Sequence, residues 1–378
     1  MVSSITTGIT AEAELREIGS QTEFGNESSA VFTNCCCPIT LPAVRCMSEI
    51  RKDPIVDRWV IVATERAAKP VELVQQARTE ALQTCPFCEG HEDETTPEIL
   101  AYRQTPAATD GGGWYVRVIP NKYPAVTAQG NSETAGSGFY QQVRGVGSHE
   151  VVIECPQHDT NLAELSTKQV GDVLTVYRDR LRGLASDERL AYALVFKNYG
   201  ALAGASMEHC HSQILATPNV PLLVAEELAG SLQHHSHSGV CPYCALLAEE
   251  LEVGSRVVLE TAQFVVICPF ASRFPFEMWI LPRTHASHFE EQNETELTEL
   301  AASLKSALRR LGAVLNDPAY NYYLHTAPLR TAAMPHFHWH LEVFPRLAQL
   351  AGFEHGSGMF INPIRPEHAA ELLRAALD

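Results

Sequence analysis

The sequence lacks any run of apolar residues long enough to span a membrane, which favours a soluble protein. Basic residues are scarce: 28 Lys and Arg stand against 45 Asp and Glu, and the formal net charge is −17. This balance argues against nucleic acid or an anionic membrane surface as a partner, although a locally basic pocket can still bind a small anion. Because a secretory signal is also missing, we expect a reducing, cytoplasmic location despite the 11 cysteines.

Residues 1–46 differ in composition from the rest of the chain. They are rich in Ser, Thr, Ala and Glu and show no hydrophobic period, so we expect a disordered N-terminal extension. The run Cys35-Cys36-Cys37 has no nearby His or acidic ligands, which disfavours a metal site there. Several Glu residues also argue against an Arg-rich transit peptide. The folded part is predicted to begin near Met47.

One pattern of Cys and His occurs twice in the remaining sequence. Each copy joins a Cys-x-x-Cys pair to two later His residues, and those two His residues are 51 positions apart in both copies. We interpret this agreement as a duplicated domain. Two thiolates and two imidazoles form a closed tetrahedral site that suits zinc. We therefore predict two zinc ions per chain, held by Cys85, Cys88, His158 and His209 and by Cys241, Cys244, His285 and His336.

Both copies also predict the same order of secondary structure. Short runs rich in β-branched and aromatic residues predict strands, and apolar stripes predict helices over 161–184 and 294–315. Each copy is thus expected to be an antiparallel sheet with a helix packed on one face, an α+β fold. The predicted boundaries are an N-terminal catalytic domain over 47–220, a solvated linker loop over 221–240 and a C-terminal domain over 241–378.

The run from His209 to Gln213 carries the predicted chemistry. As a strand it places His209, His211 and Gln213 on one face, about 6.6 Å apart at a rise of about 3.3 Å per residue. A structural histidine, or a second ligand of the same metal, is the alternative interpretation of His211. The motif already supplies four ligands without it, so we favour a nucleophile that attacks phosphorus while neutral. Gln213 can then hydrogen-bond the phosphoryl oxygens.

These motifs resemble the galactose-1-phosphate uridylyltransferase family, a branch of the histidine-triad superfamily. The resemblance rests on His-x-His-x-Gln preceded by Gly204-Ala-Ser206, with Asn198 upstream, and it extends over about residues 54–362. It implies two histidine-triad-like halves, a homodimer, and ping-pong transfer of UMP between UDP-glucose and galactose 1-phosphate through a uridylylated His211. It also implies substrate-binding roles, two of them reaching across from the partner subunit (Arg66 and Lys69) and the others being Asn121, Asn198, Ser206 and Glu354.

The sequence departs from the family pattern near the phosphate and the hexose. Cys210 stands where Pro is usual, Lys69 stands where Arg is common, and no lysine lies between Pro345 and Gly352. Some members bind iron in the second half, where the matching residues would be Glu227, His325, His338 and His340. Within the second copy, the equal spacing places His338 at the position of the nucleophile and His340 where Gln213 stands.

Three alternatives to uridylyl transfer remain open. One is an ADP-glucose phosphorylase, whose His-x-His-Ser-Gln is closer to this sequence and whose acceptor is inorganic phosphate. Another is a hydrolase of the histidine-triad kind, in which water reaches the phosphohistidine. The third is a non-catalytic two-zinc nucleotide-binding module, against which the surplus His211 and Gln213 argue.

Overall fold

We describe the chain from a computed structural model that covers residues 48–56, 58–64, 85–106, 108–130, 134–137, 139–158, 161–347 and 349–377. Its main feature is a ten-stranded sheet in which every neighbouring pair of strands is antiparallel. Across the sheet the strands are β10 (Val257–Glu260), β11 (Phe264–Ile267), β12 (Met278–Pro282), β14 (His340–Pro345), β13 (Tyr320–His325), β8 (Tyr192–Tyr199), β9 (His211–Thr217), β7 (Ser148–Ile153), β4 (Trp114–Pro120) and β3 (Leu100–Arg103). The predicted α+β class is confirmed.

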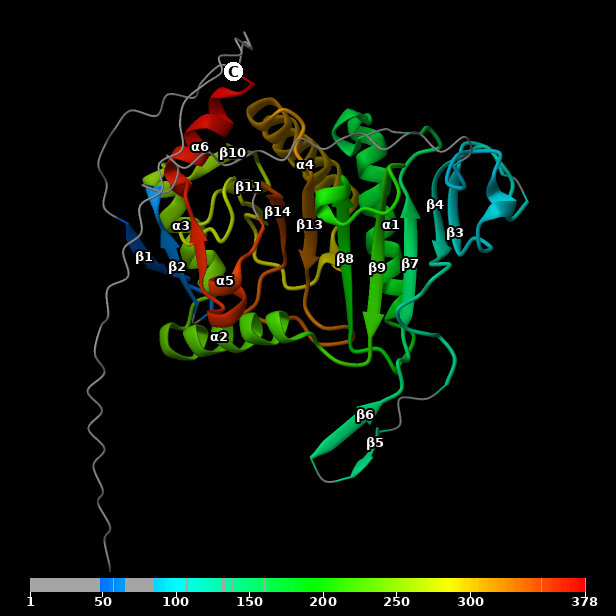
Figure 1. Cartoon of the computed structure of the whole chain (residues 1–378), viewed down its shortest axis with the longest axis horizontal. Helices are drawn as coiled ribbons and strands as arrows, with labels where there is room; N and C mark the ends of the chain where they lie inside the picture. The colour runs from blue at the N-terminus through cyan, green and yellow to red at the C-terminus, as the bar shows by residue number, and fades with distance from the viewer. Residues whose placement is uncertain are drawn as a thin grey trace, which may run out of the picture. The chain divides into compact units, whose positions relative to one another are not determined.

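The two halves of the repeat meet at the centre of this sheet. The second half supplies β10 to β14 and the first half supplies the other five strands. At the junction β13 lies beside β8 (Figure 1). In the register of this pair, Asn321 lies opposite Asn198. Backbone hydrogen bonds therefore join the halves into one continuous sheet.

Two long helices cover one face of the sheet. These are α1 (Thr167–Leu184) and α4 (Glu294–Leu315), which pack against each other behind the strands in Figure 1. A capping box of Asn293 and Glu296 satisfies the first backbone N–H groups of α4. The apolar stripes of both helices and of α6 (Pro366–Ala375) are buried with sheet side chains in one core. This core uses one face of the ten-stranded sheet. On the other face, side chains of β11 and β12 are buried with residues of α3 in a second cluster, and the first half presents His211 there.

Alternation along β9 decides which side chains reach that other face. Ile214 and Ala216 are buried in the core under the helices. Since successive strand residues point to opposite faces, His211 and Gln213 lie on the face away from α1 and α4.

The remaining elements surround the main sheet. A three-stranded sheet orders β1, β2 and β15, with β15 parallel to β2, and a separate hairpin pairs β5 with β6. No helix in the described part of the chain is long and apolar enough to cross a membrane. The bounds are β1 (Glu49–Lys52), β2 (Trp59–Val62), β5 (Thr134–Ser137), β6 (Tyr140–Val143), β15 (Phe360–Asn362), α2 (Leu222–Ser238), α3 (Pro242–Val253), α5 (Gly352–Ser357), and the 3-10 turns η2 (Glu92–Glu94), η3 (Leu162–Glu164), η4 (Ala201–Ala203) and η5 (Phe289–Glu291).

Two predictions of secondary structure had different outcomes. The helix predicted over 294–315 is confirmed as α4, but the predicted linker loop over 221–240 is wrong, because it contains α2. This helix ends at Gly239 in the left-handed conformation, and it buries Val224, Glu227 and Ser231 at helical spacing. The predicted extension over 1–46 lies outside the described residues.

Candidate active site and metal groups

The imidazole of His211 is almost fully buried at the start of β9, with 6% of its surface exposed. Its Nδ1 lies 2.7 Å from the carbonyl oxygen of His209, and a carbonyl can only accept, so Nδ1 carries the proton. Nε2 is therefore left with its lone pair. Burial lowers the pKa of His211 to about 4, although the hydrogen bond to His209 opposes this, so the ring is neutral at pH 7. A neutral imidazole with a free lone pair on Nε2 is chemically able to act as a nucleophile.

The amide group of Gln213 lies on the same face of β9 as His211, two residues further along the strand. The Oε1 atom of Gln213 is 2.8 Å from His149 Nε2 and 3.5 Å from Asn121 Nδ2. The backbone N–H of Asn121 also donates to the His149 carbonyl at 2.8 Å. The structure thus brings together the predicted residues Asn121 and Gln213. It adds His149, which the sequence did not single out because an isolated His in a strand carries no motif.

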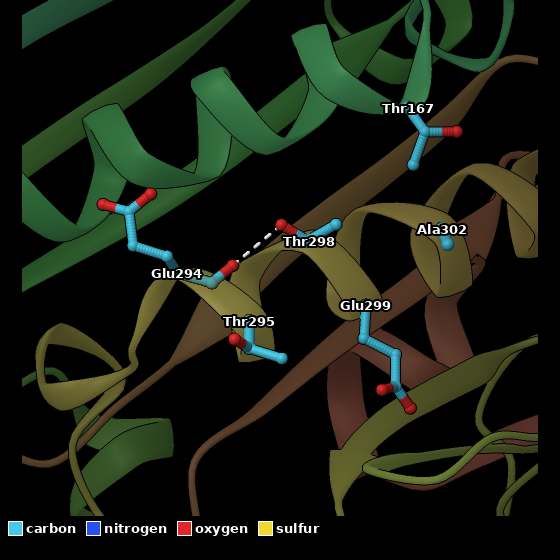
Figure 2. Close-up of a pocket in the computed structure, with 6 residues that line it drawn as sticks. All are labelled: Thr167, Glu294, Thr295, Thr298, Glu299 and Ala302. Atoms are coloured by element: carbon cyan, nitrogen blue, oxygen red, sulfur yellow. Dashed lines mark hydrogen bonds between the residues drawn. The ribbon is translucent and has the colours of Figure 1, made fainter.

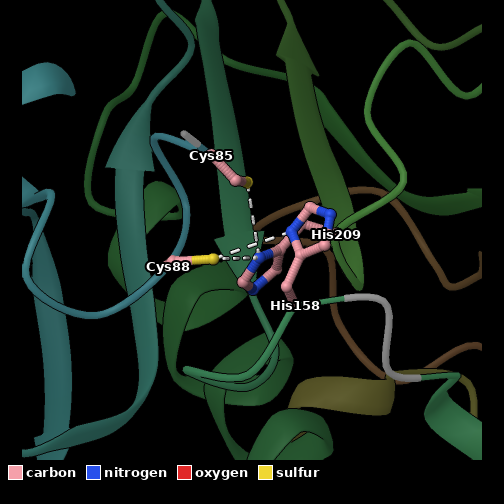
Figure 3. A group of neighbouring side chains, drawn as sticks. All are labelled: Cys85, Cys88, His158 and His209. Atoms are coloured by element: carbon pink, nitrogen blue, oxygen red, sulfur yellow. Dashed lines mark hydrogen bonds between the residues drawn. The ribbon is translucent and has the colours of Figure 1, made fainter. Parts of the chain in front are cut away.

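The structure brings together the four residues predicted for the first zinc site, which are Cys85, Cys88, His158 and His209 (Figure 3). All four precede β9 in the chain. Cys85 Sγ lies 3.6 Å from His209 Nδ1, and Cys88 Sγ lies 3.6 Å from His158 Nδ1. A tetrahedral zinc with Zn–S of about 2.3 Å and Zn–N of about 2.0–2.1 Å separates S from N by about 3.5–3.6 Å. The group therefore fits zinc. His209 Nε2 donates to the Cys155 carbonyl at 2.8 Å, which turns Nδ1 toward the metal position.

The second Cys and His group differs from the prediction in one residue. The prediction of His336 as a ligand is wrong, because the structure places His338 in the group instead. His338 Nε2 lies 2.9 Å from the Pro282 carbonyl, the same support that the first group gives its last histidine. The converging ligand atoms, all within 4.8 Å of one another, come from Cys241, Cys244, His285 and His338.

The choice of His336 was wrong because the two copies of the repeat were aligned by equal spacing. Equal spacing matched His336 with the last zinc ligand of the first half. Backbone contacts match His338 instead, because His340 Nδ1 faces the His338 carbonyl at 3.1 Å, just as the nucleophile faces the carbonyl of His209. His340 therefore stands at the position of the nucleophile, and Glu342 stands where the first half has its glutamine. The second copy is two residues longer between its histidines, which spacing alone cannot reveal.

A third group lies in the second half, and it too corrects a prediction. The iron alternative named His338, whereas the structure gathers Glu342 with the other three residues, Glu227, His325 and His340. His325 Nδ1 lies 2.8 Å from Glu227 Oε2. His340 Nε2 is buried without a hydrogen-bond partner among the described residues, 3.6 Å from Glu342 Oε1. Two imidazoles, one of them unpaired, beside two carboxylates fit a divalent transition metal.

A buried ion pair contacts the backbone of His211 from the opposite face of the sheet. Lys197 Nζ lies 2.5 Å from Glu154 Oε2, and it also donates to the His211 carbonyl at 2.9 Å. Glu154 further accepts from the Cys210 thiol at 2.8 Å and from the Tyr177 hydroxyl at 3.1 Å. Burial alone would raise the pKa of Glu154, but the charge of Lys197 together with hydrogen bonds from Cys210, Lys197 and Ser212 lowers it. Cys210, the departure from the family pattern, is thus part of this network.

Two further side chains near the site were not identified from the sequence. Asn321 Nδ2 donates to Asn198 Oδ1 at 2.7 Å and to the Ala203 carbonyl at 2.9 Å. The oxygen of Asn198 is therefore occupied, and its amide nitrogen has no hydrogen-bond partner among the described residues. The ring of Phe87 meets that of His211 edge-on, with centroids 5.5 Å apart. Phe87 could have been found, because it lies inside the predicted zinc loop. Asn321 could not, because only the junction of the two halves places it beside Asn198.

The other predicted substrate-binding residues form no hydrogen bond with this cluster within the part of the chain that the structure describes. Ser206 is exposed in the loop before β9. Glu354 lies in α5, where its carboxylate accepts from the backbone N–H of Ala351 at 3.1 Å. Arg66 and Lys69 lie outside the described residues.

A shallow surface cavity of about 490 Å³ lies elsewhere, at the contact of α1 with α4 (Figure 2). It is on the helical side of the sheet, away from the face that carries His211. Its lining contains two carboxylates and no basic group, which makes it unsuited to a phosphate ligand. The lining residues are Thr167, Glu294, Thr295, Thr298, Glu299 and Ala302.

Comparisons with known proteins agree with this geometry. Residues 39–221 match the family model described as galactose-1-phosphate uridyl transferase, N-terminal domain, and residues 146–378 match a domain of unknown function. The ADP-glucose phosphorylase of Arabidopsis thaliana is 38% identical over 335 residues, which cover 86% of this chain and 92% of the relative. The galactose-1-phosphate uridylyltransferase of Thermotoga maritima is 31% identical over 339 residues, which cover 87% of this chain and 98% of the relative.

Solved structures give the same result. The crystal structure of an ADP-glucose phosphorylase from Arabidopsis thaliana with bound ADP-glucose superposes with a TM-score of 0.75 at 37% identity, covering 86% of this chain and 98% of that one. A uridylyltransferase structure superposes with a TM-score of 0.68 at 31% identity, covering 88% of this chain and 98% of that one. The chain therefore belongs to the galactose-1-phosphate uridylyltransferase family of nucleotidyltransferases.

Proposed function

We propose that the protein moves a nucleotidyl group from a nucleoside diphosphate sugar to a second phosphate, through a covalent bond to Nε2 of His211. The observation that carries this proposal is the hydrogen bond from His211 Nδ1 to the His209 carbonyl at 2.7 Å. It assigns the proton to Nδ1 and leaves the lone pair on Nε2. A neutral, buried imidazole needs no proton removed before it attacks.

The reaction has two balanced steps. In the first, the Nε2 lone pair attacks the α-phosphorus, the bond from that phosphorus to the bridging oxygen breaks, and hexose 1-phosphate leaves. In the second, an oxygen of the acceptor phosphate attacks the same phosphorus and the P–N bond breaks, which returns the electron pair to Nε2. The imidazole ends as it began, so the enzyme is a true catalyst of exchange.

The surrounding groups stabilise the charge that develops on phosphorus. Gln213 lies on the same strand face as His211 and can donate from its amide nitrogen to a phosphoryl oxygen. Asn198 offers its own amide nitrogen, because Asn321 occupies its oxygen. Lys197 holds the backbone at His211 from behind, where it donates to that carbonyl.

The resemblance further suggests that the site is completed in a homodimer. In this proposal Arg66 and Lys69 reach the diphosphate from the partner subunit, and Glu354 binds hexose hydroxyls. Mixing inactive His211→Ala chains with inactive Arg66→Ala chains should then restore activity in hybrid dimers. Folded mutants that exchange subunits without regaining activity would exclude the shared site.

For the substrates, we favour adenylyl transfer from ADP-glucose to inorganic phosphate. The support is the 38% identity to the Arabidopsis thaliana ADP-glucose phosphorylase, together with the His-x-His-Ser-Gln run. Uridylyl transfer from UDP-glucose to galactose 1-phosphate, which the family pattern first suggests, is the second candidate. It is favoured by the Thermotoga maritima relative, which is 31% identical over nearly its whole length.

The metals proposed for the chain are structural. The two groups of two Cys and two His would each hold zinc, whose binding energy ties distant loops together and contributes to folding. The third group, in the second half, would hold a divalent metal such as iron. None of the three supplies an atom to the proposed reaction. Their task is to keep the strands that carry His211 and its counterpart His340 in place.

Mass spectrometry of the intact protein tests the function directly. Incubation with ADP-glucose alone should add one adenylyl group, located by peptide mapping on His211, whereas UDP-glucose should add a uridylyl group only if the second candidate is correct. His211→Ala should lose transfer by on the order of 10³-fold or more. His237→Ala, the same change on the exposed surface of α2, should behave as wild type.

Three outcomes would contradict the proposal. Binding of the nucleotide sugar without a covalent adduct or turnover would identify the non-catalytic nucleotide-binding module. Net hydrolysis without exchange between sugar nucleotide and labelled phosphate would identify a hydrolase. Normal transfer by His211→Ala would exclude the covalent mechanism.

A further inference from the structure

The side chain of His149 contacts the site without touching the predicted nucleophile. It lies near the start of β7, opposite β9 in the sheet, and it is half-buried. Its two ring nitrogens face different groups: Nδ1 is 3.1 Å from the backbone nitrogen of Ala125, and Nε2 is 2.8 Å from Gln213 Oε1. Both contacts are within hydrogen-bonding distance.

The backbone of Ala125 determines which nitrogen of His149 carries the proton. A peptide N–H can only donate, so Nδ1 must accept and cannot itself be protonated. In a neutral imidazole the other nitrogen then carries the hydrogen. Nε2 therefore donates to Gln213, and the atom that receives this hydrogen bond must be the amide oxygen. The reverse orientation would set the NH2 group of Gln213 against an N–H.

Asn121 presents a second donor to the same oxygen. Its own oxygen accepts from the backbone N–H of Tyr123 at 2.8 Å, which turns its NH2 group the other way. That nitrogen lies 3.3 Å from His149 Nε2 and 3.5 Å from Gln213 Oε1. Because His149 Nε2 carries a hydrogen in this tautomer, it cannot accept from Asn121, and the Gln213 oxygen is the acceptor. Two donors thus occupy the oxygen of Gln213. The described residues give its Nε2 no hydrogen-bond partner, so both of its N–H bonds are available to a ligand on the His211 face.

We propose that His149 is a positioning residue that fixes the amide of Gln213 with its NH2 group toward the transferred phosphoryl group. The role rests on the proposed function, because it needs a phosphoryl group beside His211. A glutamine amide presents a donor on one side and an acceptor on the other. If it rotates by half a turn, a carbonyl oxygen faces the phosphoryl oxygens and repels the charge that it should stabilise. In this proposal the peptide N–H of Ala125 fixes the tautomer of His149, and His149 in turn fixes the amide orientation of Gln213.

Two single substitutions distinguish this role from simple packing. His149→Gln can place an amide N–H where Nε2 was, whereas His149→Asn is shorter and can replace only Nδ1. We expect His149→Ala and His149→Asn to slow nucleotidylation of His211 by about 10–100-fold, with the main effect on the rate of the step and a smaller effect on substrate affinity. His149→Gln should recover most of the rate. If Gln and Asn behave alike, the proposal is overturned, because only Gln can place a donor at the position of Nε2.

A double-mutant cycle with Gln213→Ala tests whether the effect passes through that amide. Once Gln213 is removed there is nothing left to orient, so adding His149→Ala should cost less than about 2-fold further. Losses that multiply would show that His149 acts independently, which contradicts the proposal. Single-turnover rates of adduct formation with ADP-glucose or UDP-glucose are the measurement. If the wild-type protein forms no adduct with either substrate, that result contradicts the proposed function, independently of the His149 and Gln213 substitutions.

The tautomer of His149 can be measured without any substrate. Nitrogen-15 NMR of the zinc-loaded protein, with the signal assigned by loss in His149→Gln, should show the proton on Nε2 and an unprotonated Nδ1. A proton on Nδ1 would break the argument at its first step. This measurement stands whatever reaction the protein catalyses, so it separates failure of the inference from failure of the proposed function.

Discussion

Removing the buried charge of Lys197 should cost the protein a large part of its stability. Its side chain is 1% exposed and that of Glu154 is fully buried, with 2.5 Å between the charged atoms. In Lys197→Met the carboxylate of Glu154 remains buried with only a thiol and a hydroxyl as donors. Breaking a buried pair on one side costs about 3–5 kcal/mol, because the remaining charge loses its compensation. We expect about 3 kcal/mol here, since the two remaining donors offset part of that cost.

Urea unfolding of the zinc-loaded protein measures this effect. The total stability of a domain is about 5–15 kcal/mol, so a loss of about 3 kcal/mol should lower the unfolding midpoint strongly. Adding Glu154→Gln to Lys197→Met removes the uncompensated charge and should restore most of the loss. Lys168→Met is the matched control, because Lys168 is 79% exposed and pairs with Asp172 at 2.8 Å on the surface of α1. That change should cost less than about 0.5 kcal/mol.

Either of two results would contradict this role of the Lys197–Glu154 pair. If Lys197→Met costs no more than the Lys168 control, the pair contributes nothing that a methionine cannot replace. If the double mutant is as unstable as Lys197→Met, the loss comes from packing and not from the charge left on Glu154.

Two further predictions follow from the metal groups and the surface charges. His338→Ala should lose one of the two zinc ions measured by metal analysis, whereas His336→Ala should keep both; the opposite result would restore the register assigned from spacing. Burial would raise the pKa of Glu367, but hydrogen bonds from Arg51 and Arg256 lower it from 4.5 to about 2. A carboxyl group with a lowered pKa in the folded state stabilises it above pH 4.5 and loses this effect as the pH falls to 2. Glu367→Gln should therefore cost about 2 kcal/mol at pH 7, and the difference from wild type in urea unfolding should disappear near pH 2; a cost independent of pH would contradict it.

Local signals in the sequence predicted the elements that depend on local interactions. The helix over 294–315 was predicted correctly, and a capping box of Asn293 and Glu296 with an apolar stripe accounts for it. The first zinc set, whose four residues the structure brings together, was predictable because zinc needs a fixed number of thiolates and imidazoles. The helix α2 was missed because its apolar residues are not confined to one face, Leu222, Leu223 and Leu232 being exposed, and because three histidines lie near its end.

Residue spacing in the repeat was not sufficient to identify the last ligand of the second Cys and His group. Equal spacing of 51 positions selected His336, and a register two residues away was correct. In a strand every second residue shares a face, so His336, His338 and His340 are all compatible with the same pattern. Only the backbone contacts around His338 and the pairing of β14 with its neighbours decide which histidine reaches the cysteines.

The sequence by itself determined the family, the α+β class, the duplicated metal pattern and the surplus histidine at position 211, because each depends on residue types at short or repeated spacing. The tertiary structure decided the rest. It placed Lys197 and Glu154 behind His211, put Asn321 against Asn198 at the junction of the halves, and set His149 between Ala125 and Gln213. These contacts join residues up to 123 positions apart, and no local pattern records which strands lie side by side. The pairing of strands in the sheet determines which polar side chains come within hydrogen-bonding distance. These networks can therefore be identified only when that pairing is known.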